Sequence, residues 1–256
     1  MEIEEFNLHG FPLEAVEHDE YLKPLCNIPH RVLCVHNFLS VSQADSLRQN
    51  LRVQTSSLMK KHGTRKHALF FDVHDELAKK TYRYGQRDWP MQQGIPPMVN
   101  EVVLQKLERE FGLFFNGVVY NSYENPKSEI WWHSDLQDGI GDIVATISTG
   151  RSAYLDFRVM HKPCSRKLRY EKPISHDDDV VCSVPCHHGT LVIMGPGVNN
   201  FYQHRVLPPN EQSMEKAISE FGSCNRENLT LHYHFEQTAE NISHLNCREK
   251  SIFSNV

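Results

Sequence analysis

After Phe114 the chain consists mainly of short β-rich runs that are separated by turn-rich segments. The runs are GVVYNSY, DIVATIST, SAYLDFRVM, VVCSVP, GTLVIMG and NLTLHYHF. Short strands in this arrangement are typical of antiparallel sandwiches and jelly rolls. With 256 residues and 39% hydrophobic content, the chain is long enough to bury one large core. The pattern therefore predicts a β-sandwich or jelly roll.

Two helices are expected in front of these strands. Ser40 and Gln43 form a capping-box signature, and apolar residues follow at helical spacing, which predicts a helix over about 41–52. Pro97 opens a second helix, and Gly112 lies where a C-terminal cap belongs. The segments RVLCVH and ALFFDV read as further strands. We therefore expect an α+β chain with its helices N-terminal to a β-sandwich, in one domain.

Several segments read as irregular. Residues 1–30 are polar and resemble a lead-in, and KKHGTRKH (60–67) reads as a basic loop around a glycine. The stretch GQRDWPMQQGIPP is rich in residues that break regular structure and is also expected to be a loop.

The segment RENLTLHYH places polar residues on one face of a predicted strand. Because alternate residues share a face, Arg226, Asn228, Thr230 and His232 point one way and the two leucines between them point the other. If the leucines pack under the helices, Arg226 faces the cavity between the sheets, where a cation needs an anionic partner. The alternative is that Arg226 lies on the solvent face or at a frayed strand end.

A His-x-Asp pair, His133 and Asp135, follows two tryptophans in EIWWHSDLQDG. Two histidines and one carboxylate form the facial triad of non-haem Fe(II) oxygenases, which leaves coordination positions open. His204 follows the apolar run GTLVIMGPG, so it lies at the exit of a core strand and suits the third position. The other downstream candidates are His161, His176, His187, His188, His232 and His234. Ordinary surface polarity is the competing interpretation of the pair.

Three blocks of the sequence together resemble the AlkB-like Fe(II)- and 2-oxoglutarate-dependent dioxygenases. They are Asn121-x-Tyr123, His133-x-Asp135 with the distal His204, and Arg226-x-Asn228-Leu229-Thr230, and the similarity runs from about Val32 to His234. The resemblance implies a double-stranded β-helix, which is a jelly roll. It also implies an oxygenase domain over 31–240, preceded by the lead-in and followed by a C-terminal tail over 241–256.

The resemblance also implies roles for individual residues. His133, Asp135 and His204 would bind Fe(II), and the Arg226 guanidinium would pair with the distal carboxylate of 2-oxoglutarate. Asn121 and Tyr123 would hydrogen-bond the same co-substrate, and Asn228 would support the site. The implied reaction consumes O2, converts 2-oxoglutarate to succinate and CO2, and hydroxylates a substrate C–H bond. Hydroxylation of a carbon bound to nitrogen releases an aldehyde and dealkylates the amine.

The sequence departs from the family pattern in two places. The family usually has a second arginine six residues after the first, and here that position is His232. His232 is expected to accept a hydrogen bond from substrate or to fill space. Residues 160–188 resemble an insertion between His133 and His204. The motif Cys182-x3-Cys186-His187 in this insertion is either part of a zinc site or a set of simple loop residues.

The leading interpretation of the substrate is an N-alkylated nucleobase in single-stranded or damaged nucleic acid. Lys60, Lys61, Arg65 and Lys66 would contact phosphates, and an ordinary solvated loop is the competing interpretation of these residues. Tyr82, Tyr84 and Trp89 would stack on a base, although aromatic residues at such positions are more often core. The net charge of −5 and the missing second arginine favour a small metabolite or a protein side chain instead. A non-catalytic binding domain is the third possibility.

The remaining features concern the compartment. The start, MEIEEFNLHG, lacks the basic and apolar regions of a secretory signal, and no run of about 18 apolar residues exists. Seven cysteines without regular spacing argue against a disulfide framework. We therefore expect an intracellular protein, in the cytoplasm or nucleus, with no membrane partner. The oligomeric state stays open.

Overall fold

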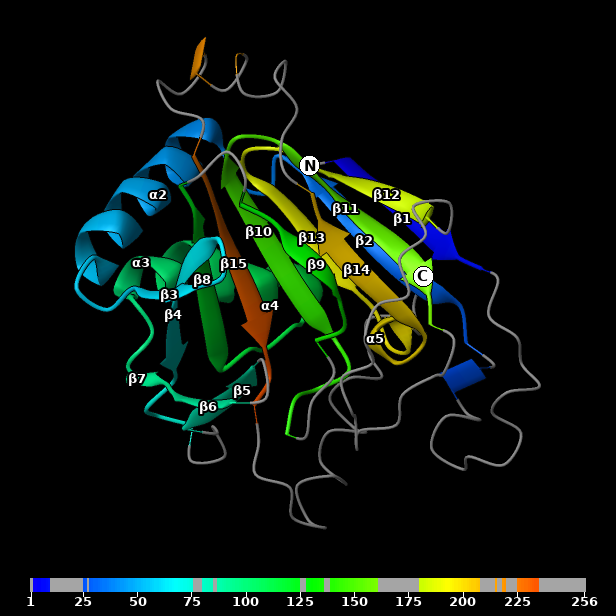
Figure 1. Cartoon of the computed structure of the whole chain (residues 1–256), viewed down its shortest axis with the longest axis horizontal. Coiled ribbons are helices and arrows are strands. Elements are labelled where there is room, and N and C mark those ends of the chain that lie inside the picture. The colour runs from blue at the N-terminus through cyan, green and yellow to red at the C-terminus, as the bar shows by residue number, and fades with distance from the viewer. Residues whose placement is uncertain are drawn as a thin grey trace.

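The computed structural model describes residues 2–9, 25–26, 28–75, 80–84, 87–124, 128–135, 139–160, 180–207, 215, 218–219 and 225–234. These residues form two facing β-sheets, a separate two-stranded ribbon and helices on one side of the molecule (Figure 1). The family resemblance predicted a jelly roll with supporting helices, and the structure confirms this α+β fold.

The larger sheet has the strand order β1-β2-β13-β10-β15-β8-β4-β3, and β7 pairs with β4. All of its neighbours are antiparallel except β4 and β7. Its strands are β1 (Glu2–Leu8), β2 (His30–His36), β3 (Lys60–His62), β4 (Arg65–Phe71), β7 (Gln92–Gln93), β8 (Gly117–Tyr123), β10 (Val144–Gly150), β13 (Thr190–Met194) and β15 (Arg226–His232).

The smaller sheet has the order β12-β11-β14-β9. Its strands are β9 (Ile130–His133), β11 (Ala153–Val159), β12 (Val180–Cys186) and β14 (Tyr202–Val206). A separate ribbon pairs β5 (Thr81–Tyr84) with β6 (Arg87–Pro90). From β8 onward the chain crosses repeatedly between the two sheets, which gives the double-stranded β-helix.

Both predicted helices are present. Helix α2 spans Val41–Thr55, and the Ser40–Gln43 capping box forms as expected. The helix runs about three residues beyond the prediction, to Thr55, whose hydroxyl donates to the Leu51 carbonyl. The second helical segment comprises α3 (Pro97–Val99), a π-helical turn η2 (Asn100–Leu104) and α4 (Gln105–Phe111). Gly112 ends it at a φ of 65°, a left-handed conformation that glycine adopts without strain.

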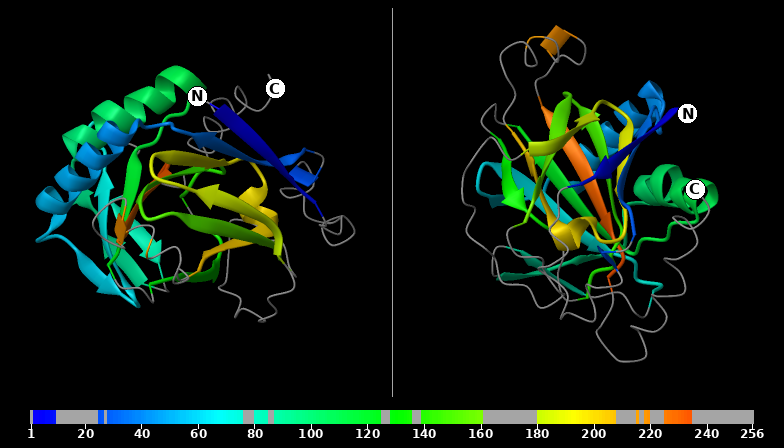
Figure 2. Two further views of the ribbon diagram at one scale, coloured as in Figure 1. Left: turned by 90° about the horizontal axis from the view of Figure 1, so that it is seen from above. Right: turned by 90° about the vertical axis from the view of Figure 1, so that its right-hand side faces the viewer.

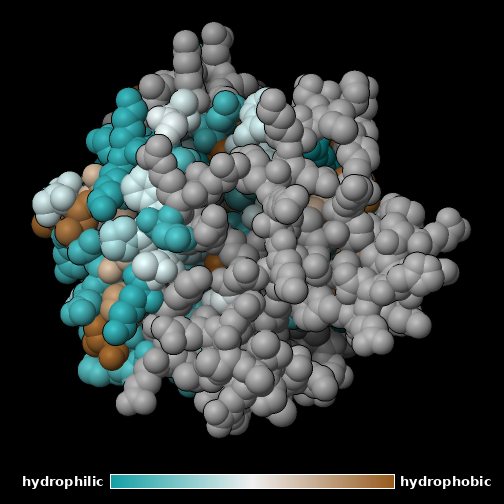
Figure 3. Space-filling view, turned by 60° about the horizontal axis from the view of Figure 1, so that its bottom comes forward, coloured by the Kyte–Doolittle hydropathy of each residue, from teal (hydrophilic) through white to brown (hydrophobic). Residues whose placement is uncertain are grey.

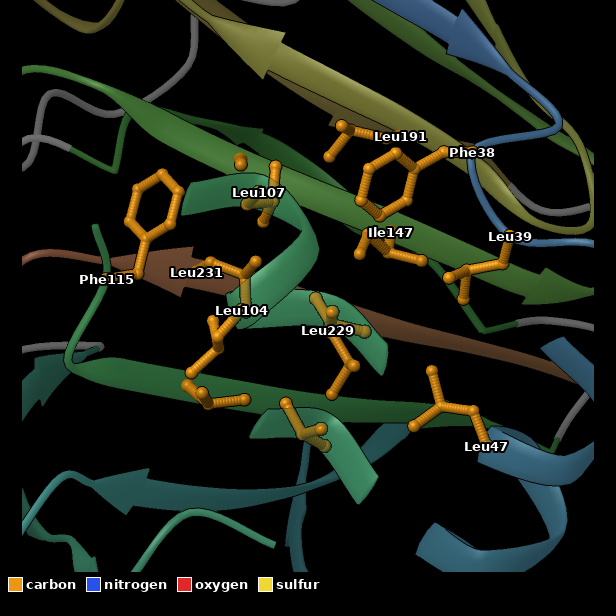
Figure 4. Packing of buried hydrophobic residues seen from close by; sticks show 14 of the residues in the cluster. Phe38, Leu39, Leu47, Leu104, Leu107, Phe115, Ile147, Leu191, Leu229 and Leu231 are labelled. Carbon is orange, nitrogen blue, oxygen red and sulfur yellow. The ribbon is translucent and has the colours of Figure 1, made fainter. Parts of the chain in front are cut away.

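The helices cover the outer face of the larger sheet (Figure 2). Leu229 and Leu231 of β15 point into this layer, where they pack with Leu47 of α2 and Leu107 of α4 (Figure 4). The predicted orientation of the leucines is confirmed, so the alternate residues of β15 face the space between the sheets. A second apolar cluster fills that space at the β2, β13 and β12 end.

The structure corrects several sequence expectations. Residues 60–67 are not a loop but the hairpin of β3 and β4, which turns at Gly63 with a φ of 58°. The segment GQRDWPMQQGIPP contains β6 and β7, and residues 2–8 of the expected lead-in form the edge strand β1, paired along its length with β2. These strands are short or polar, so backbone pairing rather than an apolar pattern defines them.

The expected insertion at 160–188 includes a strand of the smaller sheet, β12. Residues 161–179 of that segment, together with the proposed tail at 241–256, lie outside the described residues. In the part of the chain that the structure describes, no helix is both long enough and apolar enough to cross a membrane.

Candidate metal and co-substrate site

A cavity opens between the two sheets. Its walls come from strands that are distant in sequence: β4, β8 and β15 of the larger sheet and β9 and β14 of the smaller one. The predicted residues Asn121, Tyr123, His133, Asp135, His204, Arg226 and Asn228 all line it. The fold therefore brings the three blocks of the sequence to one place.

His133, Asp135 and His204 offer ligand atoms that all lie within 4.8 Å of one another, and we refer to them as the His–Asp–His group. His133 Nε2 lies 3.7 Å from Asp135 Oδ1, and His204 Nε2 lies 3.4 Å from Asp135 Oδ2. The two imidazole rings are 4.3 Å apart between centroids. Strand pairing produces this arrangement, because His204 of β14 is directly opposite His133 of β9. Neutral imidazoles and a carboxylate in such proximity fit a divalent iron.

The protonation of these residues suits metal binding. His133 Nδ1 lies 2.7 Å from the Trp131 carbonyl oxygen, which only accepts, so Nδ1 carries the proton and the Nε2 lone pair faces the site. Burial and the neighbouring His204 lower the pKa of His133 to about 3, which keeps the ring neutral. Burial alone raises the pKa of Asp135, but His204 and His133 outweigh it and hold that pKa below its usual range.

Asn199, which the sequence interpretation did not single out, ties the His-x-Asp segment to the turn before His204. The Ser134 hydroxyl donates to the Asn199 carbonyl at 2.6 Å, and the Asp135 amide donates to Asn199 Oδ1 at 3.3 Å. Asn199 belongs to the short helix α5 (Val198–Phe201) and is 1% exposed. An asparagine in NNFYQH is not distinctive, so only the fold identifies it.

Arg226 and Tyr123 line the same cavity as the His–Asp–His group. Both side chains are 1% exposed, and the guanidinium stacks over the Tyr123 ring at 4.9 Å. Arg226 Nη2 donates to Ser148 Oγ at 2.9 Å, whereas its Nε and Nη1 and the Tyr123 hydroxyl have no hydrogen-bond partner among the described residues. No acidic side chain pairs with Arg226 among the described residues. A buried cation with two open donors fits a carboxylate such as the distal one of 2-oxoglutarate.

Asn121 and Asn228 line the cavity two residues away from Tyr123 and Arg226 on the same strands, β8 and β15. They lie opposite each other in the β8–β15 ladder, and Asn121 Nδ2 donates to Asn228 Oδ1 at 3.5 Å. Asn228 also donates to Thr146 Oγ1 and to the Ile147 carbonyl, and it accepts from Thr230 Oγ1. These hydrogen bonds fix the Asn228 side chain in the cavity wall, and its role in supporting the site stays a prediction.

The other side of the cavity carries a cation, a histidine and two aromatic rings. Arg65, expected in a surface loop, is 8% exposed and donates from Nε to Asn121 Oδ1 at 3.0 Å. Burial and the adjacent Arg65 lower the pKa of His67 to about 4, so this ring is neutral near pH 7. Tyr82 and Trp89 complete the wall, and the Trp89 ring meets His67 edge-on at 5.1 Å between centroids.

The three predicted lysines lie on the β3–β4 hairpin and are exposed. Lys60 Nζ lies 6.0 Å from the Trp89 ring, and Lys66 pairs with Glu124 at 2.7 Å. In Figure 3 the coloured surface, on the side where β3, β4 and β7 lie in Figure 1, is mainly hydrophilic. The side chain of Tyr84 lies outside the described residues.

His232 does not line the cavity. It is fully buried behind Asp135, with Nε2 4.0 Å from Asp135 Oδ2, and its ring lies 5.6 Å from that of Tyr82. Burial lowers its pKa, so the ring is neutral, unlike the arginine expected there. Of the two expectations for His232, its absence from the cavity lining favours filling space, and its contact with substrate stays a prediction.

Among the described residues, the alternative zinc site is not assembled either. The Cys186 thiol lies in the apolar cluster between the sheets, and His187 Nδ1 contacts the Ser152 hydroxyl at 3.0 Å. Within the described ranges, the His–Asp–His group is the only set of three ligand residues close enough to share an ion.

A family model described as the 2OG-Fe(II) oxygenase superfamily matches residues 31–231. The chain belongs to this superfamily. Its members use Fe(II), 2-oxoglutarate and O2, which agrees with the donor set of the cavity. Residues 31–231 contain every predicted metal-binding and co-substrate-binding residue.

Curated relatives support the AlkB-like resemblance. The human alpha-ketoglutarate-dependent dioxygenase alkB homolog 3 is 31% identical over 120 residues, which are 44% of this chain and 38% of the human protein. The protein of the same name from cattle is 30% identical over 117 residues, again 44% of this chain and 38% of the relative. The matched region thus spans well under half the length of these relatives.

Two solved structures are similar at low sequence identity. The structure of OsALKBH1 has a TM-score of 0.48 at 14% identity and covers 79% of this chain and 96% of its own. A prolyl-4-hydroxylase from Pseudomonas putida has a TM-score of 0.47 at 13% identity and covers 88% of this chain and 100% of its own.

Proposed function

We propose that this protein is an Fe(II)- and 2-oxoglutarate-dependent dioxygenase that hydroxylates a substrate C–H bond. The observation that carries the proposal is the meeting, in one buried cavity, of the His–Asp–His group and an arginine with two unpartnered donors. The arginine is not explained by packing, because burying a cation without a counter-charge destabilises a fold unless a ligand compensates.

The chain's own residues would bind and orient both groups. His133, Asp135 and His204 would hold iron, while Arg226 and the Tyr123 hydroxyl would hold the distal carboxylate of 2-oxoglutarate. When bound, iron and 2-oxoglutarate supply the oxidation, in which O2 is consumed, succinate and CO2 are released and one oxygen atom enters the substrate C–H bond. The enclosed walls would exclude water and fix the distance between the reacting groups.

For the substrate, we propose an N-alkylated nucleobase in single-stranded nucleic acid. The cavity wall offers the aromatic faces of Tyr82 and Trp89 for stacking, and Lys60 and Lys61 are exposed on the adjoining hairpin for phosphate contacts. Hydroxylation of an N-methyl carbon gives a product that loses formaldehyde and restores the N–H. The AlkB-like resemblance supports the same choice.

A small metabolite or a protein side chain is the second candidate. Of the four basic residues expected to contact phosphates, Arg65 is buried in the cavity and Lys66 is engaged by Glu124. Only Lys60 and Lys61 then remain as free surface cations on the hairpin, which is a small footprint for a polyanion.

The test measures formaldehyde and succinate with Fe(II), ascorbate and an N-methylated single-stranded oligonucleotide. The wild type should release both in equal amounts, and a Lys60→Ser/Lys61→Ser variant should need more oligonucleotide, with a weaker dependence on salt. Arg109→Ser, which removes an exposed cation from α4, is the control and should behave as wild type. Succinate formation that the oligonucleotide leaves unchanged would reject nucleic acid as the substrate and favour a small molecule. The intracellular location stays a prediction from the sequence.

A further inference from the structure

The strand that carries His133 is weakly attached to its sheet. Strand β9 has four residues, and only two of its positions, His133 and Ile130, are paired with β14. The register shifts between those two pairs. Backbone pairing alone therefore gives little control over where His133 stands relative to His204.

A buried side-chain stack on the outer face of the same sheet adds to this attachment. Because neighbouring residues of a strand point to opposite faces, Trp132 faces outward where His133 faces the cavity. Trp132 is nevertheless only 2% exposed. The Arg205 guanidinium lies 4.4 Å from the indole ring, and the Arg158 guanidinium lies 4.6 Å from it. Two cations thus contact one buried indole.

Both arginines are fixed by further contacts across the sheet. Arg205 Nε pairs with Asp156 Oδ2 at 3.1 Å, and the other oxygen of Asp156 accepts from the Ser183 hydroxyl at 2.7 Å. Arg158 donates to Gln203 Oε1 from Nε at 2.9 Å and from Nη2 at 2.7 Å. The stack on the indole is therefore connected through β14 and β11 to β12.

The stack and the metal ligands occupy matching positions on the two faces. Trp132 directly precedes His133, and Arg205 directly follows His204. On the inner face the two imidazoles are 4.3 Å apart, and on the outer face the indole and the guanidinium are 4.4 Å apart. We propose that the Trp132–Arg205 stack sets the spacing of His133 and His204, which makes Trp132 a positioning residue for the metal. This inference rests on the proposed metal site.

Metal affinity distinguishes this role from simple space filling. Residues that orient metal ligands typically contribute about 10- to 100-fold to affinity. We expect Trp132→Leu to weaken Mn(II) binding in this range, measured by calorimetry without 2-oxoglutarate or substrate. Trp132→Phe keeps an aromatic face for Arg205 and should recover most of the affinity. The control is Tyr154→Leu, an aromatic-to-leucine change at an exposed position on the outer face of β11.

The outcomes separate the inference from the proposed function. Wild-type affinity in Trp132→Leu, or an equal loss in the Leu and Phe variants at unchanged unfolding temperature, overturns the positioning role. If Trp132→Leu does not fold, the test uses Trp132→Phe and Arg205→Lys, which retain the contacts in weakened form. Their affinities for Mn(II) must then lie between those of the wild type and His133→Ala. Wild-type Mn(II) affinity in both Trp132→Phe and Arg205→Lys also overturns the positioning role. Absence of Mn(II) binding in the wild type itself contradicts the metal site, not the stack.

Discussion

Replacing Arg226 by methionine tests the co-substrate subsite with a calculable effect. The change keeps an unbranched side chain but removes the two unpartnered donors, Nε and Nη1. A hydrogen bond to a charged group contributes about 1.5–3 kcal/mol, so two of them contribute about 3–6 kcal/mol. At about 1.4 kcal/mol for each factor of ten, the affinity for 2-oxoglutarate should fall about 10²- to 10⁴-fold.

The same substitution should not destabilise the ligand-free protein. Arg226 is 1% exposed and pairs with no acid among the described residues, so methionine removes a desolvated charge. The unfolding temperature without ligand should be unchanged or higher. This combination of lost co-substrate affinity and retained stability separates a binding arginine from a structural one.

Thermal unfolding with Mn(II) and 2-oxoglutarate measures both effects. At a 2-oxoglutarate concentration 100 times the wild-type Kd, the wild type should gain about 2.7 kcal/mol of stability. A variant with 100-fold weaker binding should gain about 0.4 kcal/mol at the same concentration. Arg226→Lys keeps the charge without the planar fork and should fall between them. An unchanged 2-oxoglutarate requirement, or a large loss of ligand-free stability, would refute the reasoning.

Four further predictions follow from the site. His133→Ala should abolish Mn(II) binding in calorimetry, and retained binding would contradict the assigned ligands. Lys60→Ser with Lys61→Ser should weaken single-strand binding most at low salt in a fluorescence titration, and an equal effect at all salt concentrations would argue against phosphate contacts. His232→Phe should leave the substrate KM unchanged, because the ring does not line the cavity; a raised KM would identify His232 as a substrate contact. The pKa of His67 is lowered to about 4 in the folded protein, so between about pH 6.5 and 4 the unfolded chain carries a proton on this ring that the folded chain does not, and the free energy of unfolding should fall as the pH drops through this range. His67→Gln should reduce this dependence of the unfolding temperature on pH in thermal scans, and an unchanged dependence would contradict the assignment.

The strand alternation in β15 made the inner face of the site predictable. Leucines at 229 and 231 require an apolar layer, so Arg226 and Asn228 had to face the other way, and the structure places them so. The start of helix α2 at Ser40 and the end of α4 at Gly112 could also be predicted from the sequence, because helix capping depends on local geometry alone.

Residues placed by long-range pairing were not predictable. Arg65 looked like one of four loop cations, but pairing of β4 with β8 turns it inward, where it meets Asn121. The sequence could not distinguish Arg65 from Lys66, because both are charged and adjacent. In the hairpin they point to opposite faces, so one lines the cavity and the other reaches Glu124.

The contacts that hold the ligands were also hidden in the sequence. Asn199 and the Trp131 carbonyl orient Asp135 and His133 through backbone atoms, and no residue pattern marks such contacts. The two tryptophans before His133 were visible as a feature. Their separate positions, one at 45% exposure and one buried under two guanidiniums, required the register of β9.

The central claim is that the His–Asp–His group holds an iron that oxidises 2-oxoglutarate. Its most direct test is succinate formation from 2-oxoglutarate with Fe(II), ascorbate and O2, in the wild type and in Asp135→Asn. The account predicts iron-dependent succinate in the wild type and none in the variant, which loses the only carboxylate of the group. Equal succinate formation by the two proteins would contradict it.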